Sequence, residues 1–141
     1  MFVLIAGGGR TGARLANLLL SENYKVRLIE FRPDLLGHLH QELPTEAIYE
    51  GHPVDPSVLE AAGARDAHAI AAVTSNDSIN LALCFIAKTM FEVPRTIARV
   101  NNPNNAWLFN EKFKVDVALN SADVLAHLIQ EEMSLGDMMT L

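Results

Sequence analysis

The sequence is poor in cysteine and in long apolar runs, and both shortages limit what the protein can be. Cys84 is the only cysteine, so the chain cannot form an internal disulfide, and a reducing cytoplasm is the expected location. The most apolar uncharged run, residues 78–87, is too short to span a bilayer. No basic segment precedes an apolar stretch at the start, as it would in a secretory leader. Any role at a membrane is therefore expected to come through a partner.

Clustered positive charge is also lacking. The net charge is −6, and no run of lysine or arginine occurs anywhere in the chain. A nucleic-acid surface needs such a basic patch to neutralise phosphates. We therefore expect no nucleic-acid partner.

Residue patterns for catalysis and metal binding are sparse. Tyr24 and Tyr49 are the only tyrosines, and neither has a lysine four positions on. His38 and His40 are two positions apart, which puts them on different faces of a helix, and the other histidines show no metal-ligand spacing. Cys84 lies among apolar residues, where packing is expected rather than catalysis. The sequence predicts no catalytic residue and no metal site.

What the sequence does contain is a glycine-rich junction between two apolar segments. Residues 2–6 suit a buried strand, and residues 13–20 repeat apolar side chains at helical spacing. Between them, Gly7, Gly9 and Gly12 match the G-x-G-x-x-G fingerprint of dinucleotide-binding folds. The first glycine permits a tight turn, the second lets a pyrophosphate approach the backbone, and the third lets the helix pack against the strand. The alternative is a tight turn that binds no ligand.

An acidic residue follows at the distance that the fingerprint expects. The second predicted strand, residues 24–30, ends in Glu30, which lies 23 positions after Gly7. In dinucleotide-binding folds an acid about 20 residues on accepts hydrogen bonds from a ribose diol. Glu30 also disfavours NADP, because a 2′-phosphate would meet like charge. The plainer reading is a carboxylate at a strand end.

The rest of the chain alternates predicted strands and helices. With half of its 141 residues hydrophobic, it has the length and composition of one globular domain. Strands are predicted over residues 2–6, 24–30, 46–50, 69–74, 96–100 and 115–119. Helices are predicted over residues 13–20, from 32 onward, 56–62, 76–91, 103–109 and from a Ser121 cap to about 133. This alternation predicts an α/β Rossmann fold with a six-stranded parallel sheet in the order 3-2-1-4-5-6 and helices on both faces.

Several motifs, in order along nearly the whole chain, resemble the RCK domain, also called the KTN or TrkA-N domain. They are residues 7–12 (GGGRTG), 51–63 (GHPVDPSVLEAAG), 72–74 (AVT) and 97–101 (IARVN). Such domains regulate potassium channels and transporters of the Trk and Ktr type. The resemblance implies a cytoplasmic regulatory subunit at the inner face of the membrane. It would bind NAD(H) or an adenine nucleotide (ATP, ADP or AMP), form a homodimer or a higher ring, and contact a membrane-embedded potassium channel or transporter subunit.

The resemblance also implies a set of nucleotide-binding residues. The glycine loop would hold phosphates and Arg10 would reach the distal phosphate, although a solvated arginine at the helix start is the plainer alternative. Arg32 would lie beside the adenine, or could pair with a 2′-phosphate, and Arg99 could offer a further cation. Residues 51–54 would form the wall of the adenine pocket. The full implied set is Gly7, Gly9, Arg10, Thr11, Gly12, Glu30, Phe31, Arg32, His52, Pro53, Thr74 and Arg99.

Two departures from the family pattern concern the base and the domain organisation. The family usually has Gly-Asp-Ala-Thr where this chain has GHPV at residues 51–54, so an acidic contact to adenine is replaced by His52. The usual C-terminal regulatory domain does not follow, which leaves residues 1–141 as one nucleotide-binding domain. It is either an excised piece or a free-standing N-domain.

Two hypotheses for function and two for the apolar helices stay open. The first function is a nucleotide sensor that passes a conformational signal through a dimer; the second is a small NAD-dependent oxidoreductase or a fragment of one. Residues 79–90 and 125–139 are rich in apolar side chains, including Met138 and Met139. These faces could form ordinary core or a surface for self-association.

Overall fold

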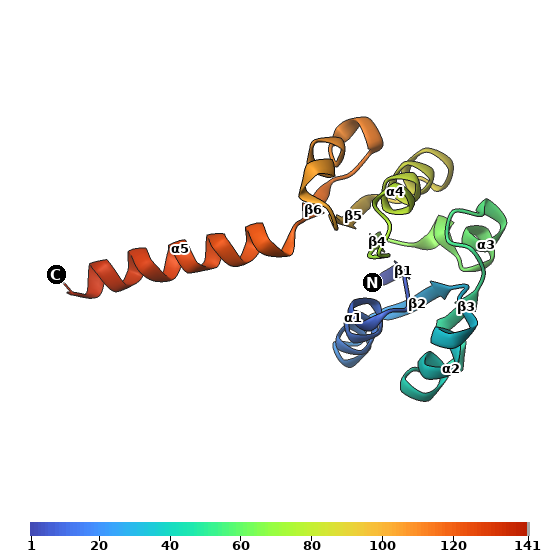
Figure 1. The fold of residues 1–141 in the computed structure, drawn as a ribbon. Coiled ribbons are helices and arrows are strands. Elements are labelled where there is room, and N and C mark those ends of the chain that lie inside the picture. The colour runs from blue at the N-terminus through green and yellow to red at the C-terminus, as the bar shows by residue number, and fades with distance from the viewer. Residues whose placement is uncertain (141) are drawn as a thin grey trace.

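A single parallel sheet forms the centre of the protein, as the alternation of segments predicts (Figure 1). The computed structural model describes the backbone of residues 1–140 and the side chains of residues 1–136. The strand order is β3-β2-β1-β4-β5-β6, and every neighbouring pair is parallel, which confirms the predicted Rossmann arrangement. The strands are β1 (Phe2–Ala6), β2 (Lys25–Glu30), β3 (Ile48–Glu50), β4 (Ala69–Ala72), β5 (Arg95–Arg99) and β6 (Val117–Leu119).

Helices cover both faces of this sheet and create two separate cores. They are α1 (Arg10–Ser21), α2 (Pro33–Glu42), α3 (Pro56–Ala61), α4 (Asp77–Phe91) and α5 (Ser121–Thr140). One core joins α3 and α4 to Leu4 and Ala6 of β1, and the other joins α1 and α2 to Ile5 of the same strand. Alternate side chains of a strand point to opposite faces, so β1 serves both cores. It must therefore be apolar throughout.

Several predicted boundaries were wrong; the fourth strand, for example, ends at Ala72 and not at residue 74. Three further differences have a local reason. In place of the helix predicted over residues 103–109, Pro103–Leu108 form a 3₁₀ helix with no fully buried side chain, and Leu108 alone of this segment packs against the core, so little packing holds a longer α-helix there. The third strand starts at Ile48, because Thr45–Ala47 form a 3₁₀ turn that begins after a proline. The sixth strand starts at Val117, since the amide of Val115 is engaged in the preceding turn with the carbonyl of Asn110.

The last helix also differs from its prediction. Asn120, not Ser121, caps it, because the Asn120 side chain accepts a hydrogen bond from the amide of Ala122 at 3.1 Å. Helix α5 continues to Thr140 rather than ending near residue 133, and it projects away from the sheet (Figure 1). Its apolar side chains are therefore exposed: Val124, Leu125, Leu128, Ile129, Met133 and Leu135.

Helix α5 consequently does not add to the core, unlike α4, whose Leu83, Cys84 and Ala87 are fully buried. The ordinary-core reading is thus correct for much of α4 and wrong for residues 124–135. The side chains of Met138 and Met139 lie outside the described residues. Among the helices that the structure describes, none combines the length and the apolar character needed to cross a membrane.

Close packing at the glycine loop fixes how α1 sits on β1. Gly7 has a φ of +113°, a conformation that side chains rarely adopt. A Cβ atom at Gly12 would lie 1.7 Å from the carbonyl oxygen of Gly7, so only glycine lets the helix approach this closely. A Cβ at Gly37, within α2, would meet nothing within 4 Å.

We expect Gly12→Ala to lower the free energy of unfolding by at least about 2 kcal/mol, because α1 must move off β1. Gly37→Ala is the matched control and should be neutral or stabilising by up to about 1 kcal/mol, since alanine favours helix. Urea unfolding followed by circular dichroism measures both. Equal stabilities for the two variants would contradict the packing described for Gly12.

Candidate functional site

The candidate site lies where the carboxyl ends of β1, β2, β4 and β5 meet. The chain leaves β1 toward one side of the sheet and β4 toward the other, so these two neighbouring strands form the topological switch point. In open α/β sheets, ligands bind in the crevice outside the strand ends at this point. The predicted glycine loop, residues 7–12, lies directly at the end of β1.

The glycine loop offers a bare backbone at the start of a helix. Gly9 is the N-cap of α1, and a Cβ there would meet nothing within 4 Å, so the backbone at the helix start is not covered by side chains. No side chain caps α1, and no acidic residue lies in its first turn. The partial positive charge of the helix start is therefore not neutralised locally. This is the environment that a phosphate group favours.

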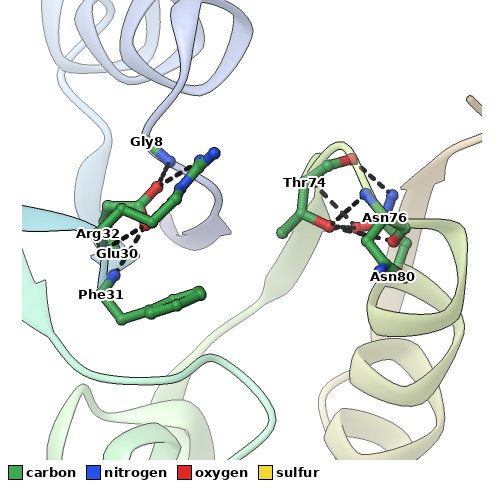
Figure 2. Close-up of polar contacts among 7 residues, drawn as sticks. All are labelled: Gly8, Glu30, Phe31, Arg32, Thr74, Asn76 and Asn80. Carbon is green, nitrogen blue, oxygen red and sulfur yellow. Dashed lines mark hydrogen bonds and ion pairs between the residues drawn. The ribbon is translucent and has the colours of Figure 1, made fainter. Parts of the chain in front are cut away.

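The carboxylate of Glu30 is the most heavily hydrogen-bonded group at the site (Figure 2). Its Oε1 accepts from the amide of Gly8 at 2.8 Å and from Nη2 of Arg32 at 2.9 Å. Its Oε2 accepts from the amides of Phe31 and Arg32, at 2.8 and 2.9 Å, and from Nε of Arg32 at 3.1 Å. Glu30 thus joins the glycine loop to the end of β2 and the start of α2.

Glu30 stays charged although its side chain is only 2% exposed. Burial alone would raise its pKa, but the Arg32 guanidinium and the amides of Arg32, Gly8 and Phe31 outweigh burial and lower the pKa to about 2. The group is therefore an anion at neutral pH. It can accept hydrogen bonds but is a poor general base.

The opposite wall of the crevice is built around a second buried polar residue, Asn80 of α4 (Figure 2). Its Oδ1 accepts from the hydroxyl and the amide of Thr74, at 2.6 and 3.0 Å. Its Nδ2 donates to the carbonyls of Thr74 and Arg99, both at 3.0 Å. Asn80 therefore fixes the chain after β4 against the end of β5.

Asp77, at the start of α4, extends this wall. Its carboxylate accepts from the amides of Asn101 and Asn102, at 2.7 and 2.9 Å, and from the Asn105 side chain at 2.9 Å. Burial raises the pKa of Asp77, but these donors, led by the Asn101 amide, outweigh it and leave the pKa below its ordinary value. The loop after β5 is thereby held against α4.

Arg99 bridges the crevice from β5 to α1. Its Nη1 donates to the hydroxyl of Thr11 at 3.1 Å, and its Nε and Nη2 donate to Oδ1 of Asn101, at 2.9 and 2.6 Å. Both partners are neutral, and the ion pairs found among the described residues do not include Arg99. Its positive charge therefore adds to that of the α1 start.

A narrow apolar groove of about 170 Å³ runs between the two walls. Phe31, Pro53 and Ile79 give it an apolar lining, while Gly7, Glu30 and Thr74 form its polar end. The Phe31 ring is 43% exposed and points into the space between the Glu30 and Asn80 clusters (Figure 2). His52 packs against the Phe31 ring, with 4.8 Å between the ring centroids. A flat base fits such a lining.

Arg10 and Gly9 do not line this narrow groove. They line a second, wider groove between α1 and α2, together with Arg14, His38 and Glu42. Six of the predicted residues line the narrow groove: Gly7, Glu30, Phe31, Arg32, Pro53 and Thr74. His52 packs against Phe31, Arg99 contacts Thr11, and Gly12 packs against the backbone of Gly7.

Sequence reasoning missed the residues that hold the walls in place. Asn80, Asp77 and Asn101 support the crevice through hydrogen bonds to Thr74, Arg99 and each other. One signal was present for Asn80, because it is a polar residue inside the apolar run 78–87. A buried polar side chain needs hydrogen-bond partners, but the sequence does not reveal which ones.

Comparison with known proteins places these features in a family. The family model described as the TrkA-N domain matches residues 3–121. The Trk system potassium uptake protein TrkA of Mycobacterium tuberculosis is 38% identical over 142 aligned residues, which cover all of this chain and 63% of that protein. The chain thus spans less than two thirds of the length of this relative.

Solved structures show the same fold. The TrkA-N domain of the inner membrane protein ybaL from Escherichia coli superposes with a TM-score of 0.78, at 17% identity, covering 92% of this chain and 94% of that one. A structure described as the GsuK channel bound to NAD superposes with a TM-score of 0.70, at 23% identity, covering 94% of this chain and 24% of that one.

The pKa of Glu30 predicts a pH dependence of stability. The folded pKa, about 2, lies below the ordinary 4.5, so the ionised group stabilises the fold above pH 4.5, and this contribution is lost as the pH falls toward 2. We expect Glu30→Gln to cost about 2 kcal/mol at pH 7, since an amide then faces backbone donors. Its difference from the parent should shrink between pH 4.5 and 2.

Urea unfolding at several pH values measures this difference. Glu60→Gln is the control, because Glu60 is an exposed carboxylate paired with Arg65. A stability difference for Glu30→Gln that stays constant down to pH 2 would show that the ionised carboxylate does not hold the loop.

Proposed function

We propose that this chain, which belongs to the TrkA-N domain family, is the nucleotide-sensing regulatory domain of a potassium uptake system. Its curated relative in Mycobacterium tuberculosis is a Trk system potassium uptake protein, and GsuK, which shares the fold, is a channel whose structure was solved with NAD. The ligand is NAD(H) or an adenine nucleotide (ATP, ADP or AMP). The partner is a membrane-embedded potassium channel or transporter subunit, with the domain at the inner face of the membrane.

One observation carries the proposal: positive charge converges on an open backbone at the switch point. The start of α1 has no side-chain cap and no acidic residue in its first turn. The guanidinium of Arg99 is held beside this turn by two neutral partners, Thr11 and Asn101. Phosphate groups are stabilised both by helix starts and by arginine. Phosphates bound at Gly7, Gly9 and Thr11 would contact both.

The groove beside the glycine loop would hold the rest of the ligand. The ribose lies at Glu30, and the base lies between Phe31 and Pro53, with His52 packed behind Phe31. Thr74 lines the groove opposite Glu30. Arg10 reaches the distal phosphate of a longer ligand by turning from the α1–α2 groove toward the start of α1. NADP is disfavoured, because its 2′-phosphate would approach the Glu30 carboxylate.

The chemistry of the groove supports sensing rather than catalysis. Among its lining residues, the one carboxylate, Glu30, has a pKa of about 2, and no histidine, cysteine, lysine or tyrosine lines it in the part of the chain that the structure describes. Cys84 is buried away from it, and burial raises the pKa of its thiol to about 12. We therefore assign no catalytic role, and the bound nucleotide serves as the signal.

The dimer that would transmit the signal forms through α5. This helix of 20 residues projects from the domain, and its large apolar side chains among residues 124–135 are 44–65% exposed. Isolated helices of this length are only marginally stable in water. Packing against the α5 helix of a second copy removes the apolar surface from solvent. A homodimer, or a ring of such dimers, would couple the crevices of two chains.

The nucleotide proposal predicts that Arg99→Gln weakens binding of ADP and NADH about tenfold or more, because a charge-assisted contact to phosphate is lost. Arg95→Gln is the matched control: Arg95 is exposed at the other end of the same strand, β5. Isothermal titration calorimetry measures affinity, and a thermal-shift panel of NAD, NADH, NADP, ATP, ADP and AMP ranks the ligands. Absence of any response in that panel would refute the nucleotide-sensor proposal.

The dimer proposal predicts that the double variant Leu125→Glu/Ile129→Glu is monomeric, because two charges enter the apolar face of α5. Gln130→Glu/Ser134→Glu adds the same charge at the same spacing on polar positions of α5 and should remain dimeric. Sedimentation velocity distinguishes the two species. A parent chain that is monomeric at tens of micromolar, or an unchanged dimer in both variants, would contradict a dimer through α5.

A further inference from the structure

The Glu30 carboxylate has no free acceptor for a ribose in this structure. Three backbone amides and two N–H groups of the Arg32 guanidinium already donate to its two oxygens. A carboxylate offers about four lone-pair sites, so these five donors saturate it. A ribose diol can bind Glu30 only if some present donor leaves.

Of these donors, only the Arg32 guanidinium can leave without disturbing the backbone. The amide of Gly8 belongs to the glycine loop, and those of Phe31 and Arg32 follow directly from β2. The backbone of Arg32 is also fixed as the N-cap of α2, where its carbonyl accepts from the amides of Leu35 and Leu36, each at 3.1 Å. The Arg32 side chain, by contrast, is 41% exposed and ends a flexible stem.

The guanidinium and a ribose diol make the same kind of contact. Arg32 places one N–H on each carboxylate oxygen, Nη2 on Oε1 and Nε on Oε2. A vicinal diol likewise presents two adjacent O–H donors, and a carboxylate can accept one on each oxygen. Departure of Arg32 therefore frees one acceptor position on each oxygen.

We propose that Arg32 is an internal competitor for the ribose subsite, so that nucleotide binding is an exchange of the Arg32 guanidinium for the ribose diol on Glu30. This inference rests on the proposed nucleotide site and adds a device within it. In the free domain, the Arg32 guanidinium occupies the Glu30 carboxylate. Only the fraction of molecules in which Arg32 has left Glu30 can bind the diol. The apparent affinity is lowered accordingly, and the Arg32 side chain moves whenever a nucleotide enters.

If Arg32 competes with the ribose, removing this positive charge should tighten the binding of an anionic nucleotide. We expect Arg32→Ala to bind AMP about three- to tenfold more tightly than the parent, because the half-exposed bidentate pair between Arg32 and Glu30 no longer has to break before the diol binds. Binding of 2′-deoxy-AMP, which lacks one hydroxyl of the diol, should tighten less than about twofold. Arg65→Ala is the control, because Arg65 also pairs with a glutamate, Glu60, but on an exposed surface away from the crevice.

Isothermal titration calorimetry of both ligands with all three proteins tests this. If Arg32→Ala binds AMP more weakly than the parent, Arg32 is a ligand contact and the inference is wrong while the nucleotide site stands. Equal tightening of AMP and 2′-deoxy-AMP would overturn the exchange with the diol. If none of the proteins binds AMP, ADP or NADH, the proposed function fails and the inference fails with it.

A second variant keeps the test valid if Arg32→Ala does not fold. Arg32→Lys retains the charge, but a single ammonium group cannot place a fixed pair of donors on the two oxygens. It should tighten AMP binding in the same direction as Arg32→Ala and by a smaller factor. Unchanged or weaker AMP binding by Arg32→Lys would overturn the inference.

Discussion

The ligand-facing edge of the first half of the domain depends on one buried carboxylate. Glu30 gathers the amides of Gly8, Phe31 and Arg32, which belong to the glycine loop, the end of β2 and the start of α2. Without an anion at this point, those three amides would point toward one another with no acceptor, at a cost for each unsatisfied donor. The shape of the phosphate loop is thus tied to the residue that is proposed to bind the ribose.

The second half of the domain repeats this principle with different residues. Asn80 and Asp77 hold the ends of β4 and β5 through hydrogen bonds to Thr74, Arg99 and Asn101. The hydrogen bond from Arg99 to Thr11 connects the two walls, and it is weak enough for a phosphate to replace it. If a nucleotide replaced the contact between Arg99 and Thr11, the two halves of the domain would be joined through the ligand and not directly, as they are in the free domain. Differential affinity of about 1–3 kcal/mol between two such arrangements is enough for regulation.

The sequence predicted the features that depend on neighbouring residues, but not the contacts between segments that are distant in the chain. The alternation of strands and helices predicted the strand order, because right-handed crossovers leave few arrangements for a parallel sheet. The apolar β1 was recognisable because it serves two cores. The distance from Gly7 to Glu30 indicated an acid at the crevice, but not that Arg32 would occupy it, since that depends on side-chain geometry after β2. The 3₁₀ segment at 103–108 has little packing to hold an α-helix, and the apolar face of α5 has no partner within the domain. The periodicity of apolar residues does not predict whether such packing exists.

Amide chemical shifts of the isotopically labelled chain, recorded with and without ADP, test the central claim most directly. A nucleotide in the crevice should shift the amides of residues 7–12, 31–32 and 74–76 together, because all three segments surround the proposed ligand. It should leave residues 38–42, on the far side of the α1–α2 groove, unchanged. Shifts confined to residues 38–42 and the outer face of α1 would place the ligand in the other groove and contradict the account.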